Sequence, residues 1–152
     1  MANISESIEK FIIATMGDND FVDISRNSLA DYFSCAPSQI NYVLDTRFTV
    51  DRGYVKESKR GGSGFIKISK IKTSDSNAYL NNLVVESIGD ELSVKRMIQI
   101  LDKLVSDGVM SKKESEIAES ALSDESLSMP FTIKDKIRAK AFKNILLKLM
   151  ID

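Results

Sequence analysis

The fold is decided by residues 34–69, which read SCAPSQINYVLDTRFTVDRGYVKESKRGGSGFIKIS. Pro37 suits the first turn of a helix, where its missing N–H group costs no hydrogen bond. The apolar residues that follow recur with the spacing of one helix face. They are Ile40, Val43, Leu44 and Phe48. We therefore predict a helix over Pro37–Phe48 that turns this face inward.

The other side of this helix is polar and almost uncharged. With a turn of about 100° per residue, the residues pointing away from the core are Ser38, Tyr42, Asp45 and Thr49, flanked by Gln39, Asn41 and Thr46. Hydroxyl and amide side chains bond base edges and phosphates. Such a face is typical of a helix that reads DNA, although a small helix also carries a polar face without any ligand.

Two alternating stretches, Tyr54–Ser58 and Phe65–Ser69, lie on either side of a glycine-rich segment. Two strand-like runs around such a connection predict a β-hairpin. Its tip carries Lys59 and Arg60, followed by the glycines Gly61, Gly62 and Gly64. Glycine lets the backbone approach another surface closely, and an arginine on such a tip can enter a narrow minor groove. The alternative is a plain turn with two solvated bases.

The residues before Pro37 predict two further helices. Apolar residues from Ile4 to Ile12 share one face, and Ser25 suits the N-cap of a second helix that ends near Phe33. Residues 34–36 then form a short turn. Two short helices across a tight turn, followed by a hairpin, are the layout of a winged helix-turn-helix domain.

Two arginines outside the wing are candidate phosphate ligands. Arg26 lies near the start of the second helix, an end that usually abuts the DNA backbone. Arg47 lies near the buried stripe, so it interacts with the helix C-terminal dipole, pairs with an acid such as Asp31, or reaches a phosphate. Together the expected DNA-binding residues are Arg26, Ser38, Gln39, Asn41, Tyr42, Thr46, Arg47, Lys59, Arg60, Gly61, Gly62 and Gly64.

Beyond a polar linker at residues 73–77, the periodicity is helical throughout. We expect an α+β fold that is mostly α: a DNA-binding domain at 1–72 and a small helical domain at 78–152. The last helix follows Met129-Pro130, and its expected apolar face is Ile137, Ala141, Ile145, Leu146 and Leu149. The apolar stripes exceed what a half-chain of this size buries, which predicts a homodimer.

Composition narrows the class of protein. The chain has no histidine and a single cysteine, Cys35. It therefore lacks the commonest general base and the usual zinc ligands, and we expect no enzyme, no cofactor and no metal site. No apolar run has the length of a membrane span and no secretory leader is visible, so we expect a cytoplasmic protein.

The net charge of −1 hides an uneven distribution. Residues 37–72 hold eight bases and three acids, a net charge of +5, whereas residues 1–36 hold two bases and six acids, a net charge of −4. A basic block of this kind suits a surface that faces phosphates, but it is also compatible with an ordinary solvated face.

The motifs resemble the class-three stress-gene repressor family of Gram-positive bacteria (CtsR). The resemblance is carried by residues 35–43, 46–49, 52–54 and 57–64, and more weakly by residues 78–81, 127–129 and 137–139. It implies a dimeric winged-helix repressor with a helical dimerisation domain. Such a repressor binds a double-stranded DNA operator of tandem direct repeats and silences Clp chaperone and protease genes until heat or another stress releases it.

The same resemblance implies that Arg60 enters the minor groove, that the wing takes part in heat sensing, and that a protein-arginine kinase and the Clp machinery act on the repressor. The family's tip usually has four consecutive glycines, and Ser63 departs from that pattern. The alternative function is a winged-helix adaptor that binds other proteins and no DNA, because a fold alone does not establish function.

Overall fold

The structure, a computed structural model, describes residues 3–59 and 64–151. The chain divides into two compact units, one reaching Lys72 and the other running from Thr73 to Met150. Each unit has its own core and is described by itself.

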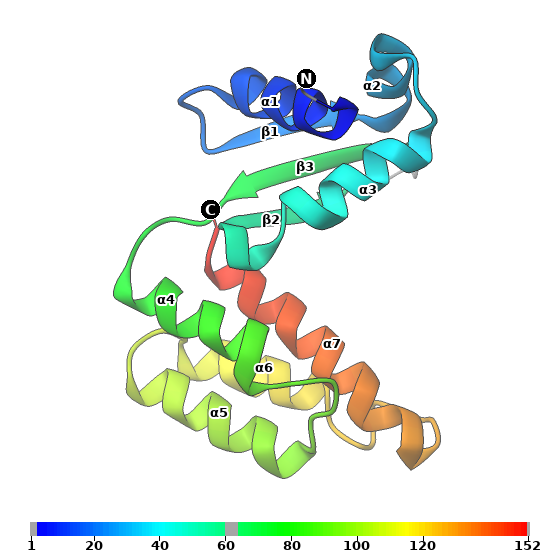
Figure 1. Cartoon of the computed structure of the whole chain (residues 1–152). Helices are drawn as coiled ribbons and strands as arrows, with labels where there is room; N and C mark the ends of the chain where they lie inside the picture. The colour runs from blue at the N-terminus through cyan, green and yellow to red at the C-terminus, as the bar shows by residue number, and fades with distance from the viewer. Residues whose placement is uncertain (1–2, 60–63, 152) are drawn as a thin grey trace. The chain divides into compact units, whose positions relative to one another are not determined.

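The first unit has three helices and a small sheet (Figure 1). Its elements are α1 (Ile4–Met16), β1 (Phe21–Ser25), α2 (Arg26–Phe33), α3 (Pro37–Arg47), the short 3₁₀ turn η1 (Val50–Arg52), β2 (Tyr54–Ser58) and β3 (Phe65–Lys70). The predicted helix-turn-helix and wing strands are confirmed. Pro37 occupies the first turn of α3, and the Ser25 side chain caps α2 by accepting from the Ser28 N–H.

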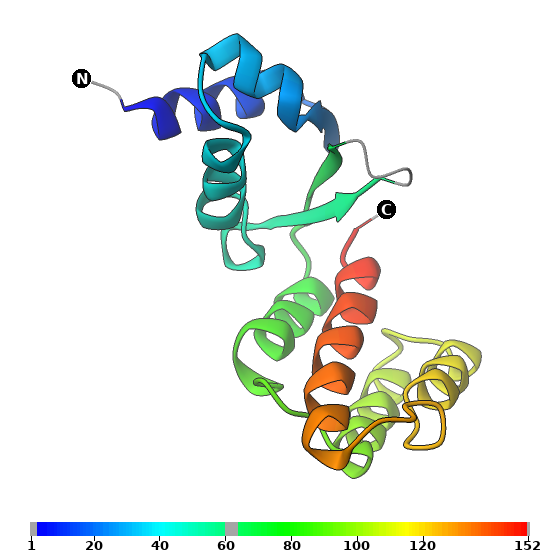
Figure 2. The ribbon, with the colours of Figure 1, turned by 90° about the vertical axis from the view of Figure 1, so that its right-hand side faces the viewer.

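The sheet has three antiparallel strands in the order β1-β3-β2. Val22 of β1 lies opposite Ile68 of β3, and Lys56 of β2 lies opposite the same residue on its other side. In the sequence, residues 21–24 form only a short extended stretch between two helices. It becomes a strand because it pairs with β3 along its whole length, and Figure 2 shows the hairpin from the side.

The core of the first unit confirms the inward face predicted for α3. The side chains of Ile40, Val43, Leu44 and Phe48 are at most 2% exposed, and they pack with Ile8 and Ile12 of α1. The sheet contributes Ile66 and Ile68 to the same core. Burial on this scale fixes α3 against α1 and the sheet, which leaves its polar side outward.

The second unit is helical. It comprises α4 (Asp75–Asn82), the π-helical segment η2 (Leu83–Ser87), α5 (Val94–Ser106), α6 (Lys112–Ala121) and α7 (Phe131–Leu149). Helix α4 begins inside the stretch expected as a linker, because the Ser74 hydroxyl accepts from the Asn77 N–H at 3.0 Å and caps it. None of the described helices is both long and apolar enough to cross a membrane.

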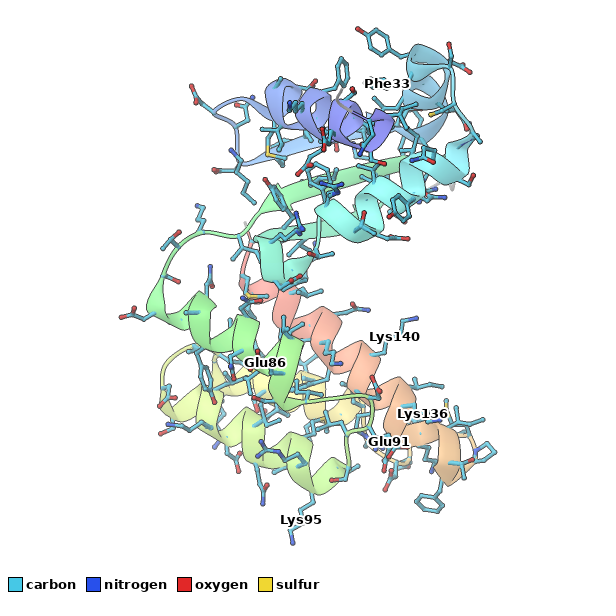
Figure 3. All side chains as sticks on the ribbon, in the orientation of Figure 1. Phe33, Glu86, Glu91, Lys95, Lys136 and Lys140 are labelled. Carbon is cyan, nitrogen blue, oxygen red and sulfur yellow. The ribbon has the colours of Figure 1, made fainter. Side chains whose placement is uncertain are left out.

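Helix α7 buries a face that overlaps only in part with the one the sequence indicated: Leu146 is buried as expected, but Ile137 is not. Its buried residues are Arg138, Ala139, Phe142 and Leu146, whereas Ile137 is 38% exposed. The reason is Arg138, whose guanidinium donates to the carbonyls of Leu122 and Leu92 and pairs with two carboxylates. A buried arginine with all these partners rotates the helix away from the simple apolar stripe. Figure 3 shows Lys136 and Lys140 on the outer part of α7.

Candidate nucleic-acid interface

The outermost ridge of α3 consists of Ser38, Tyr42 and Asp45, one helical turn apart. All three are exposed, and the Tyr42 side chain is 56% exposed. Asn41 is exposed beside them. The Thr46 hydroxyl donates to the Tyr42 carbonyl at 2.7 Å, so it is engaged within the helix. The ridge therefore presents hydroxyl, amide and carboxylate groups to solvent.

Two of the candidate residues on α3 point toward α1. The Gln39 amide donates to the Ser5 hydroxyl at 3.0 Å, and the Arg47 guanidinium pairs with Glu9 at 3.2 Å. The acid that pairs with Arg47 is thus Glu9, and the suggested Asp31 was wrong. Sequence spacing could not identify the partner, because Glu9 lies 38 residues away in the chain. These contacts hold both ends of α3 against α1.

The base of the wing is tied to the start of α2. The Arg26 N–H donates to the Gly64 carbonyl at 3.0 Å. Gly64 has a φ of +79°, a region that favours glycine. The Lys59 N–H donates to the Phe65 carbonyl, and the Lys59 ammonium pairs with Asp23 of β1 at 2.9 Å. The candidates Arg60, Gly61 and Gly62, together with Ser63, lie outside the described residues.

A polar pocket of about 250 Å³ lies between α3 and the wing strands. Its lining is Arg26, Asn41, Leu44, Asp45, Lys56, Ser58 and Ile66. The Arg26 Nε atom is buried and has no hydrogen-bond partner within residues 3–59 and 64–151. A buried donor of this kind is costly unless a ligand or water satisfies it. The pocket therefore has the chemistry of an anion or hydrogen-bond acceptor site.

Lys56 and Asp45 also line this pocket, although neither is among the expected DNA-binding residues and the sequence placed only Asp45 on the outward face of the helix. The Lys56 ammonium donates to the Leu44 carbonyl at 3.1 Å and to Asp45 Oδ1 at 2.9 Å. The signal was the period of two along β2, which places Lys56 on the helix-facing side of the sheet, opposite Ile68. Within the described part of the chain, no three acid or cysteine side chains gather where they could hold a metal ion.

The matches with known proteins cover nearly the whole chain. The family model "CtsR N-terminal HTH domain" matches residues 3–72, and "CtsR C-terminal dimerization domain" matches residues 76–147. The chain is 39% identical over 151 residues to the transcriptional regulator CtsR of Geobacillus stearothermophilus, covering 98% of both chains. It is 40% identical over 148 residues to that of Staphylococcus haemolyticus, covering 96% of both.

Among solved structures, a crystal structure of CtsR in complex with a 26bp DNA duplex matches with a TM-score of 0.49 and 37% identity, over 99% of this chain and 100% of that one. One family model matches the first unit and the other matches the second. The alignments with the two relatives, both named transcriptional regulators, cover nearly the whole length of each. The chain therefore belongs to the CtsR family of transcriptional regulators.

Proposed function

We propose that the chain is a cytoplasmic, homodimeric repressor that binds a DNA operator in a sequence-specific way. Helix α3 enters the major groove and the β2–β3 wing lies along the adjacent minor groove. One observation carries the proposal: the exposed ridge of α3 is polar and stands beside the pocket at the base of the wing. A major groove about 12 Å wide admits a helix with such side chains.

Burial explains why the ridge is available for this role. The apolar face of α3 is fully engaged in the core, and Gln39 and Arg47 are engaged with α1. The side chains left outward include those of Ser38, Asn41 and Tyr42, which are uncharged and can bond base edges, and that of Asp45. A rigidly held helix also keeps these groups at fixed positions, which base reading requires.

Arg26 and the wing supply the contacts to the backbone. The Arg26 side chain lies at the N-terminus of α2 and lines the pocket between α3 and β2. Its unsatisfied Nε atom would find an acceptor in a phosphate oxygen. The minor-groove role of Arg60 rests on the sequence alone, because that residue lies outside the described ones.

A gel-shift titration with the chain's own upstream promoter region tests the proposal. Tyr42→Ala should weaken operator binding by about tenfold or more, because a base-reading contact is worth roughly 1–3 kcal/mol. The matched control is Tyr32→Ala, which removes a tyrosine that is 69% exposed on α2. If wild-type protein binds the promoter no better than a scrambled duplex, the proposed function is wrong.

Further parts of the proposal rest on family resemblance. They are control of Clp chaperone and protease genes, release by heat or stress, and action by a protein-arginine kinase and the Clp machinery. Footprinting on genomic DNA with and without heating tests the first two. Binding that persists unchanged through a heat-shock range would rule out thermal release for this chain.

The second candidate function, a protein-binding adaptor, has one observation in its favour. Phe11, Tyr32 and Phe33 form an aromatic cluster with ring centroids 5.0–5.6 Å apart. Phe11 and Tyr32 are exposed, and Figure 3 labels the third member, Phe33, at the end of α2. The gel shift separates the two candidates, since an adaptor binds neither the promoter nor a scrambled duplex.

A further inference from the structure

We infer that Asp45, held by Lys56, is a specificity-determining residue that accepts a hydrogen bond from a cytosine amino group in the major groove. This rests on the proposed DNA-binding function and names a base that the site reads. Asp45 lies on the outermost ridge of α3, in line with Ser38 and Tyr42. Its side chain is 73% exposed although it is paired with Lys56.

The pairing leaves one carboxylate oxygen available. Lys56 takes Oδ1 at 2.9 Å, and Oδ2 has no hydrogen-bond partner among the described residues. The Lys56 ammonium also donates to the Leu44 carbonyl, so two acceptors on α3 fix its position. Lys56 therefore restricts the rotation of the Asp45 side chain and leaves its second oxygen to accept from another donor.

The contact between Lys56 and Asp45 also reduces the repulsion between Asp45 and the DNA phosphates. A carboxylate that approaches DNA meets the phosphate charges, and this repulsion weakens binding to every sequence. Lys56 compensates the charge of Asp45 at contact distance, and its side chain is only 27% exposed. A lysine buried to this degree, with two acceptors, is placed to neutralise Asp45 and not to reach a phosphate.

The chemistry of the base edges then selects cytosine. In the major groove, guanine presents two acceptors and thymine presents an acceptor and a methyl group, so neither can donate to a carboxylate. Adenine offers an amino donor, but its N7 acceptor lies beside it, and that pair suits an amide that both donates and accepts. Cytosine offers an amino donor without a neighbouring acceptor.

Selection from a randomised duplex library tests the inference, with base preferences measured for the wild-type chain and for Asp45→Ala, Asp45→Asn, Lys56→Met and Lys56→Arg. Asp45→Ala should lose a preference of about tenfold for cytosine at one position and keep the others. Asp45→Asn should also lose the cytosine preference, because Lys56 holds the amide oxygen and the NH2 group left toward the bases donates where the carboxylate accepted. Lys56→Met should weaken the cytosine preference at the same position. Lys56→Arg should keep that preference, because a guanidinium also pairs with a carboxylate.

Two controls separate base reading by Asp45 from a general effect of charge on DNA binding. Lys67→Met removes a lysine on the neighbouring strand, which stacks on Phe21, and should leave the cytosine preference unchanged. Asp45→Ala that tightens binding to all duplexes equally, with an unchanged base profile, would show simple repulsion and overturn the inference. A wild-type chain without any base preference would instead mean that the proposed DNA-binding function has failed. Asp45→Asn is nearly isosteric and exposed, so a fold defect does not confuse the result.

Discussion

Arg138 donates hydrogen bonds to two main-chain carbonyls and pairs with Asp124 and Asp135, although none of its side chain is exposed. These contacts join α7 to the segment before α5 and to the segment after α6. Taking a guanidinium out of water is costly, and only a complete set of partners compensates. Arg138 is therefore the organising side chain of the second unit.

Removing Arg138 should destabilise this unit strongly. We expect Arg138→Ala to lower the free energy of unfolding by about 3 kcal/mol or more, because two buried carbonyls lose their donors and two carboxylates lose their counter-charge. Arg138→Lys should not restore it, since an ammonium lacks the guanidinium's fork of donors. Urea denaturation followed by circular dichroism measures both. Lys140→Ala, an exposed change on the same helix, should stay within about 0.5 kcal/mol of wild type.

The proposed ligand of Arg26 is a phosphate, so its removal should weaken DNA binding without regard to sequence. Arg26→Ala should weaken binding to operator and scrambled duplexes by similar factors and reduce the salt slope of binding by about one unit. Titrations at several salt concentrations measure the slope. A loss confined to the operator, with an unchanged slope, would show that Arg26 reads a base and contradict the phosphate role.

For single residues, the sequence predicted roles that depend on chain neighbours, but it did not predict contacts between distant residues. Pro37 and Ser25 act where the sequence placed them, because a first-turn proline and an N-cap serine depend only on their neighbours. Gln39 and Arg47 have partners more than thirty residues away. Helical periodicity gives the side of a helix but not the element that packs there, so it could not anticipate these contacts.

Among the elements, α6 shows the most complete N-cap. The Ser111 hydroxyl accepts from the Glu114 N–H at 3.0 Å, and Glu114 Oε1 accepts from the Ser111 N–H at 2.8 Å. The hydrogen bond from the Ser111 backbone is the main cause that lowers the pKa of Glu114 from its ordinary value of 4.5, and the hydrogen bond with the Ser111 side chain adds to it. Ser111 and Glu114 have the spacing of a capping box in the sequence, and both of its hydrogen bonds are present in the structure.

The lowered pKa of Glu114 has a sign that experiment can check. A carboxyl with a lower pKa when folded stabilises the native state above its unfolded pKa, and this stabilisation is lost as the pH falls through the folded pKa. Wild-type protein should therefore lose more thermal stability than Glu114→Gln as the pH falls from neutral to below 4.5. Parallel Tm–pH curves for the two proteins would contradict the contribution of this group.

The elements also show where periodicity misleads. The apolar pattern of α7 indicated a buried face through Ile137, but Phe142 and Arg138 occupy the core. A rule that counts only apolar residues cannot place an arginine at the centre of a helix face. Strand β1 was missed as a sheet member for a related reason, because strand pairing with β3 is a tertiary contact.

For the whole molecule, the unburied side of α7 bears on assembly. Ile133 is 46% exposed and Ile137 is 38% exposed, one turn apart on a helix of the family's dimerisation domain. Exposed apolar residues in such a row indicate a surface that another copy covers. The sequence indicated the surplus of apolar surface, but the residues left uncovered depend on the rotation of α7.

Charging this surface should separate the dimer. The double variant Ile133→Asp, Ile137→Asp should be monomeric at micromolar concentration, because two carboxylates would have to be buried at the contact. Light scattering measures the mass. Ile13→Asp makes the same change at a 42% exposed isoleucine of the first unit and should leave the dimer intact. A dimer that survives the double variant would place the contact elsewhere.

The hydrogen bond from the Arg26 N–H to the Gly64 carbonyl makes one amide proton an indicator of the state of the wing. That proton is protected from exchange while the residue before β3, Gly64, stays hydrogen-bonded to the start of α2. Its deuterium exchange should therefore slow when an operator duplex is bound and accelerate on warming before the core amides of α3 exchange. The resonance of the Arg26 amide would then distinguish local opening of the hairpin from unfolding of the whole domain.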